Sequence, residues 1–205
     1  MSAAAPAEPE VREVDTPHGP ARITDHRGES RAVVLLGHGA GGGIAAPDLV
    51  AATGVALAAG LHVVLVEQPY RVAGRRNAAP IAQLDAAWLA VVADVRQTVL
   101  DGPLVFGGRS SGARVACRTA AQGAAVAVLC LAFPLHPPGR PEKTRLPELA
   151  APDVPVLVVQ GALDASASEF ETVFCSAGRR GLEVELAPGE LARLTGATVA
   201  PIAAS

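Results

Sequence analysis

The chain has 205 residues, half of them hydrophobic, and its 20 acidic residues slightly outnumber its 17 basic ones. A chain of this length can bury a core without disulfides or metal ions, so we expect one domain and no metal site. The formal charge of −3 excludes the basic face that nucleic-acid binding requires. The hydrophobic content likewise excludes intrinsic disorder as the general state of the chain.

The N-terminal end carries neither a basic segment nor a long apolar one, so it does not resemble a secretory signal. No apolar run approaches the roughly 20 residues that a membrane helix needs. We therefore expect a cytoplasmic protein with no membrane partner. Cys117, Cys130 and Cys175 do not form a redox or zinc motif, and we expect them to be small buried apolar residues in a reducing compartment.

Short apolar segments alternate along the chain with longer segments of helical spacing. Two weak strands flank a Pro- and Gly-containing turn and predict a hairpin at a sheet edge. The later apolar runs lack polar alternation, which is typical of strands buried on both faces, so we predict an α/β fold with a mostly parallel sheet covered by helices on both faces. Strands are predicted at residues 11–14, 21–24, 32–36, 61–66, 103–106, 126–131, 154–159 and 182–186, and helices at residues 47–59, 80–99, 111–121 and 168–177.

The domain organisation that follows is simple. Residues 1–9 are rich in Ala and Pro, and we expect them to be a disordered tail. Residues 10–190 form the single predicted domain, and residues 191–205 are a divergent C-terminal segment. In an α/β fold of this kind ligands bind beyond the carboxyl ends of the strands, so chemistry is expected in the loops there.

One such loop contains a serine in a characteristic setting. Residues 108–112 have the sequence Gly-Arg-Ser-Ser-Gly, between a predicted strand and a predicted helix. In a G-x-S-x-G elbow the serine adopts a strained backbone, and small flanking residues let strand and helix approach each other. This context favours an elbow over an ordinary turn. Ser110 is the candidate nucleophile, and the backbone N–H of Ser111 is a candidate donor to an oxyanion.

The glycine-rich loop after residues 32–36 has two interpretations. Gly37, Gly39 and Gly42 satisfy G-x-G-x-x-G, and Glu67 ends the next strand, as in a dinucleotide site with its ribose-binding acid. A hairpin before the strand and a helix delayed until Pro47 both argue against that site.

The favoured interpretation is a His-Gly oxyanion loop. In it the backbone N–H of Gly39 or Ala40 faces a carbonyl group held over Ser110. We expect His38 to position this backbone rather than to take up a proton. Downstream of the serine, Asp164 follows the strand at residues 154–159, which is where an acid belongs in the chain order Ser, Asp, His.

Several segments together resemble one family. They are LGHGAG at residues 36–41, QPY at 68–70 with GRR at 74–76, GGRSSGAR at 107–114, FPLHPPGRPEK at 133–143 and QGALD at 160–164. Over residues 31–190 the chain resembles the small α/β-hydrolase-like family that includes bacterial dienelactone-hydrolase-like proteins, testis-expressed protein 30 and KAT8 regulatory NSL complex subunit 3. The resemblance implies a single-domain α/β-hydrolase fold without a large lid. It also implies Ser110 as nucleophile, Asp164 as acid, no cofactor and an ester-like small-molecule substrate.

The chain departs from the family at the catalytic histidine. The family has this residue after the last strand, in a segment similar to Pro-Gly-Asp-His, whereas residues 188–191 here are Pro-Gly-Glu-Leu. All five histidines precede Asp164, and the last of them is His136. Losing the histidine of a serine triad costs about a millionfold in kcat. Residues 191–205 reflect either true divergence or a shifted or prematurely ended reading frame.

The remaining candidates surround the expected pocket. His136 lies in the loop after residues 126–131, where it either substitutes for the missing base or shapes the pocket, as the resemblance implies. Tyr70 is a further pocket residue by the same resemblance. Arg71, Arg75 and Arg76 either line the rim for an anionic substrate or form a solvated cluster.

The sequence thus leaves three functions open. The leading hypothesis is a serine hydrolase of ester-like small molecules, with Ser110 and Asp164 as catalytic residues. The second is a catalytically impaired relative that acts as a binding or scaffold protein. The third is a nucleotide-binding oxidoreductase, which rests on the glycine loop alone. The sequence carries no indication of oligomeric state.

Overall fold

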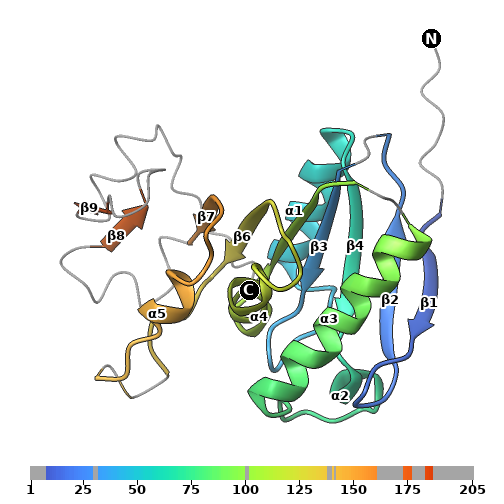
Figure 1. Ribbon diagram of the computed structural model, residues 1–205, viewed down its shortest axis with the longest axis horizontal. Coiled ribbons are helices and arrows are strands. Elements are labelled where there is room, and N and C mark those ends of the chain that lie inside the picture. Colours follow the sequence, from blue (N-terminus) through green and yellow to red (C-terminus); the bar gives the residue numbers. More distant parts are fainter. Residues whose placement is uncertain are drawn as a thin grey trace.

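The computed structural model describes residues 8–29, 32–99, 102–137, 140 and 142–160, together with two short strands, β8 and β9. Its centre is a seven-stranded sheet in the order β1-β2-β4-β3-β5-β6-β7 (Figure 1). The strands are β1 (Glu10–Val14), β2 (Ala21–His26), β3 (Val33–Gly37), β4 (His62–Glu67), β5 (Leu104–Arg109), β6 (Ala127–Leu131) and β7 (Val156–Val159). The helices are α1 (Pro47–Ala58), α2 (Pro69–Val72), α3 (Ile81–Thr98), α4 (Ser111–Thr119) and α5 (Leu146–Leu149).

The predicted α/β fold is confirmed in its main features. Strands β1 and β2 form the antiparallel hairpin at the edge of the sheet, and β2 also pairs antiparallel with β4. The five strands from β3 to β7 run parallel to one another. Between β6 and β7, the described residues hold one helix of four residues, α5, and no large lid.

The central strands β3 and β4 are buried on both faces, which explains their unbroken apolar runs. In β7, by contrast, Leu157, Val158 and Val159 are exposed, so the expectation of a strand buried on both faces is wrong for residues 154–159. Along β3, Leu35 belongs to the cluster that packs under α3 and α4, whereas Leu36 belongs to the cluster under α1. The larger cluster is centred on Trp88 of α3, whose ring meets that of Phe106 edge to face at 5.5 Å between centroids. Because successive side chains of a strand point to opposite faces, both helical layers are held by the same strands.

One predicted helix is wrong. The sequence predicts a helix over residues 168–177, yet Val173–Ser176 is strand β8, which pairs antiparallel with β9 (Glu183–Leu186). Val173 and Phe174 have high strand propensity, and cross-strand pairing depends on a distant segment that a local helical pattern does not report. The predicted tail, residues 1–9, lies outside the described residues except for its last two, and residues 191–205 lie outside them altogether. The expectation of burial for Cys175 is not tested, because only the backbone of β8 is described.

Two cysteines meet in the core although they are far apart in sequence. Cys117 of α4 and Cys130 of β6 are buried free thiols with their sulfur atoms 3.5 Å apart. The hydrogen bond between them, together with burial, raises the pKa of Cys117 above its ordinary value. The expectation of small buried residues is confirmed for both, and their contact is an addition from the structure.

A polar pair lies at the opposite end of the sheet from the elbow serine. His62, the first residue of β4, hydrogen-bonds through Nε2 to the carboxylate of Asp25 in β2, and both side chains are almost fully buried. A buried polar group is tolerated when it has a partner and is costly when it does not. This pair therefore ties the start of β4 to β2 of the hairpin.

Replacing Asp25 by Ala is expected to lower the free energy of unfolding by about 1–3 kcal/mol, because the buried nitrogen of His62 loses its partner. Urea unfolding monitored by circular dichroism measures the loss. In the double variant Asp25→Ala/His62→Leu, much of the loss should be recovered, because no polar atom is left unpaired. As a matched control, Glu13→Ala removes the exposed partner of Arg22 and should change the value by less than about 0.5 kcal/mol.

Candidate active site

The elbow serine has the strained backbone that its motif predicts. Ser110 lies between β5 and α4 with φ 50° and ψ −103°, a conformation that costs a residue with a side chain about 1–3 kcal/mol. Its N–H donates to the carbonyl of Leu131 at 2.9 Å, and its own carbonyl accepts from the N–H of Arg114 at 3.2 Å. The backbone of the serine is therefore held between the ends of β5, β6 and the start of α4.

Three glycines bring β3 and the elbow into backbone contact. A Cβ atom added to Gly108 would lie 2.4 Å from the carbonyl oxygen of Gly37, and one added to Gly112 would lie 2.2 Å from the same atom. Real Cβ atoms do not approach a backbone oxygen so closely. The glycines on either side of Ser110 are thus required by the packing of the elbow against the end of β3.

The glycine loop after β3 lies alongside Ser110. A Cβ atom on Gly39 would be 3.7 Å from the Cβ of Ser110. No described residue accepts a hydrogen bond from the backbone N–H of Gly39 or Ala40. The structure brings Gly39 next to the serine side chain, and Ser111 follows the serine as the first residue of α4.

His38 holds this loop and does not face the serine as a base. Its Nε2 accepts the backbone N–H of Gln68 at 3.0 Å, so its Nδ1 carries the proton and donates to the carbonyl of Gly39 at 2.8 Å. Burial lowers the pKa of His38 below its ordinary value. Both ring nitrogens are engaged, as expected for a residue that positions the backbone.

Two further side chains support the same loop. The hydroxyl of Tyr70, in α2, donates to the carbonyl of Ala40 at 2.9 Å, and its ring packs edge to face against His38. On the other side, Arg109 forms an ion pair with Asp48 of α1, with Nε 2.8 Å from the carboxylate. The glycine loop is therefore held by α2 through Tyr70, and the neighbouring end of β5 is tied to α1 through Arg109.

A family model described as an alpha/beta hydrolase domain matches residues 30–177. The chain belongs to this α/β hydrolase domain family. The match covers most of the chain and includes both the glycine loop and the elbow. The strand order found here also differs from the 3-2-1-4-5-6 order of the dinucleotide-binding fold.

Solved structures share the α/β hydrolase fold with this chain. An α/β serine hydrolase homologue from Coxiella burnetii is similar with a TM-score of 0.65 and 17% identity, over 77% of this chain and 76% of that one. An α/β serine hydrolase without a lid from Xanthomonas campestris has a TM-score of 0.60 and 21% identity, over 78% and 74%. An esterase from Pyrobaculum calidifontis reaches 0.51 and 20% identity, over 62% and 45%. These identities establish the fold and not the activity.

Two further predicted site residues, His136 and Asp164, are not shown in contact with Ser110. His136 is half-buried in the loop after β6, and its carbonyl accepts from Arg145 at 3.3 Å. Asp164 lies outside the described residues, so its position relative to Ser110 stays a prediction. Within the described chain, no helix is long and apolar enough to cross a membrane, and no group of three or more metal-binding side chains occurs.

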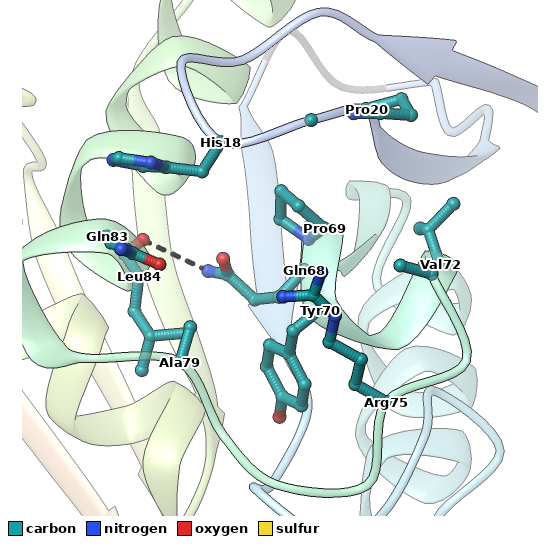
Figure 2. A pocket seen from close by; sticks show the side chains of 12 residues that line it. His18, Pro20, Gln68, Pro69, Tyr70, Val72, Arg75, Ala79, Gln83 and Leu84 are labelled. Carbon is teal, nitrogen blue, oxygen red and sulfur yellow. Dashed lines mark hydrogen bonds between the residues drawn. The ribbon is translucent and has the colours of Figure 1, made fainter.

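Sequence reasoning missed a pocket at the hairpin side of the glycine loop. Four polar residues line it, His18, Gln68, Arg75 and Gln83, and Tyr70 forms part of its wall (Figure 2). Gln68, Tyr70 and Arg75 lie in the QPY and GRR segments that carry the family resemblance, whereas no motif marks His18 or Gln83. The turn between β1 and β2 lies over the carboxyl end of β4 only because β2 runs antiparallel to it, which is information from the sheet and not from the local sequence.

Replacing Gly112 by Ala is expected to lower the free energy of unfolding by about 1–3 kcal/mol or more, because its Cβ would overlap the Gly37 carbonyl. Urea unfolding measures this value. Gly54→Ala is the matched control, since this exposed glycine of α1 has nothing within 4 Å of an added Cβ. That substitution should raise stability by about 0.5–1 kcal/mol, and equal effects of the two would contradict the backbone contact.

The lowered pKa of His38 predicts a pH dependence of stability. The unfolded chain binds a proton at this residue below about pH 6.5, whereas the folded protein does so only at lower pH. The contribution of His38 is therefore fully present above about pH 6.5 and is lost as the pH falls below it. Urea unfolding at about pH 8 and at about pH 5 measures how far the free energy of unfolding falls between these two pH values. That fall should be smaller for His38→Gln than for the wild type. An identical loss in both proteins would rule out this role of His38, since His26 is present in each.

Proposed function

We propose that this α/β hydrolase domain protein is a serine hydrolase that acts on an ester-like small molecule. The observation that carries the proposal is the strained backbone of Ser110 with Gly39 directly beside it. An elbow of this kind presents a serine hydroxyl at the end of the sheet. The serine hydrolases named among the similar structures support the same assignment.

In the proposed reaction the Oγ of Ser110 attacks the ester carbonyl carbon and loses its proton to a base. The negative charge on the carbonyl oxygen is stabilised by backbone N–H groups of Ser111 and of Gly39 or Ala40. The tetrahedral intermediate breaks the bond to the alkoxide, which leaves with a proton as an alcohol. Water then attacks the acyl-serine, releasing a carboxylic acid and restoring the hydroxyl of Ser110.

The identity of the base is the finer part of the proposal. His38 has both ring nitrogens engaged, and His62 is paired with Asp25 at the far end of the sheet. His136 follows a strand whose carboxyl end is next to that of β5. We propose His136 as the proton acceptor, with Asp164 as the acid of the site.

A second function, binding without turnover, is favoured by a specific observation. The histidine beside the proposed oxyanion loop is committed to that loop, and the sequence has no histidine after His136. In this alternative the elbow and its glycines persist because the packing of β3 against α4 needs them. The hydroxyl of Ser110 would then be no more reactive than an ordinary serine.

A fluorophosphonate probe that reacts with activated serines separates the two functions. The wild-type protein is expected to be labelled, and Ser110→Ala is expected to reduce labelling to background, because the attacking oxygen is gone. Intact-mass measurement gives the stoichiometry and locates the adduct. Ser111→Ala is the matched control, since it removes a neighbouring hydroxyl and keeps the backbone N–H that the oxyanion needs.

An absence of labelling in the folded wild-type protein would contradict the hydrolase and favour the binding function. The base is tested in the same assay with His136→Gln. A fall of about 10²–10⁴-fold in labelling rate supports His136 as proton acceptor, whereas an unchanged rate contradicts that role.

A further inference from the structure

A cavity on the hairpin side of the glycine loop does not include the elbow serine. It is a cavity of about 360 Å³ between the β1–β2 turn, α2 and the first turn of α3 (Figure 2). Ser110, Gly39 and Ala40 are not among its lining residues. The volume is at the lower end of the range for small-molecule pockets, so it suits a ligand of few atoms.

The cavity contains a buried hydrogen-bond acceptor with no partner. Gln68 is 6% exposed, and its Nε2 donates to the carbonyl of Leu84 at 3.2 Å. Its Oε1 is buried and has no hydrogen bond within the described chain. Figure 2 shows the amide group of Gln68 directed into the cavity, on the side of His18. A buried carbonyl oxygen without a donor costs about 1–3 kcal/mol, and a ligand O–H or N–H placed there would remove that cost.

A positively charged side chain, that of Arg75, also lines this cavity. Arg75 is exposed, forms no ion pair with a described carboxylate, and extends its guanidinium group back across the cavity toward Gln68 (Figure 2). A guanidinium group binds a carboxylate through two parallel hydrogen bonds. Among the lining residues Arg75 is the one with a permanent positive charge, which matches a single negative charge better than a doubly charged phosphate.

The rest of the lining is largely apolar. Pro69, Val72, Ala79 and Leu84 contribute carbon atoms to the wall between the acceptor and the cation. A ligand that satisfies all three parts has a carboxylate at one end, a hydroxyl group that donates, and a short carbon chain between them. Neither a purely apolar molecule nor a polyanion meets this combination.

We propose that this cavity binds a short hydroxy-monocarboxylate, with its carboxylate on Arg75 and its hydroxyl donating to Oε1 of Gln68. The hydroxyl is bound at the buried end of the cavity, beside Gln68, and the carboxylate at the end lined by the exposed Arg75. The site is independent of turnover at Ser110, because none of its contacts involves the serine or the oxyanion donors.

Titration of the full-length protein with 3-hydroxybutyrate, lactate and glycolate, followed by calorimetry or by chemical shifts, tests the proposal. At least one of the three is expected to bind, and butyrate, which lacks the hydroxyl, to bind about fivefold to tenfold more weakly than 3-hydroxybutyrate. Butane-1,3-diol, which lacks the carboxylate, should bind at least tenfold more weakly. No binding of any hydroxy acid would overturn the proposal, as would tighter binding of inorganic phosphate.

Variants locate the ligand. Arg75→Gln should weaken the binding of 3-hydroxybutyrate and of butyrate by at least tenfold. Arg76 is adjacent and does not line the cavity, so Arg76→Gln should change neither affinity. Gln68→Met should abolish the preference for 3-hydroxybutyrate over butyrate. Equal affinities for wild type and Arg75→Gln would overturn the site, and this arm stands even if the buried Gln68→Met variant fails to fold.

Discussion

The close contact between the end of β3 and the start of α4 is the constraint on which the rest of the site depends. The carbonyl oxygen of Gly37 lies where a side chain on Gly108 or Gly112 would have to be. This contact leaves no room for the chain between β5 and α4 to relax into an ordinary turn. The strained conformation of Ser110 is the consequence, and the packing of both sheet faces supplies the stability that compensates for it.

The loop that follows Gly37 inherits its position from the same contact. It leaves β3 beside the elbow and is then held by polar contacts that come from elsewhere in the chain. His38 is fixed by the backbone of Gln68, and the carbonyl of Ala40 accepts from Tyr70. The backbone beside the serine is thus preorganised by Gln68, which follows β4, by Tyr70 of α2 and by the hydrogen bond from His38 to Gly39 within the loop, which is the arrangement that electrostatic stabilisation of an oxyanion needs.

The sequence predicts those parts of the fold whose cause is local. Apolar runs predict the central strands because both of their faces are buried, and the spacing of Gly108 and Gly112 predicts the elbow because it reports a backbone contact. Strand β8 was not predicted, since its conformation depends on pairing with β9. Tyr70 and Arg75 were expected near a pocket, but a separate cavity beside Gln68 was not predicted, because the hairpin turn that covers it is brought there by antiparallel pairing with β4.

The contact between Cys117 and Cys130 has a practical consequence. A thiol reacts as its thiolate, so a buried thiol with a raised pKa is inert toward alkylating reagents while the fold is closed. These two sulfurs lie between the helix that begins at the elbow and the neighbouring strand β6. Alkylation at Cys117 or Cys130 therefore requires separation of α4 from β6. The rate of alkylation then reports how often α4, the helix that follows the elbow, opens.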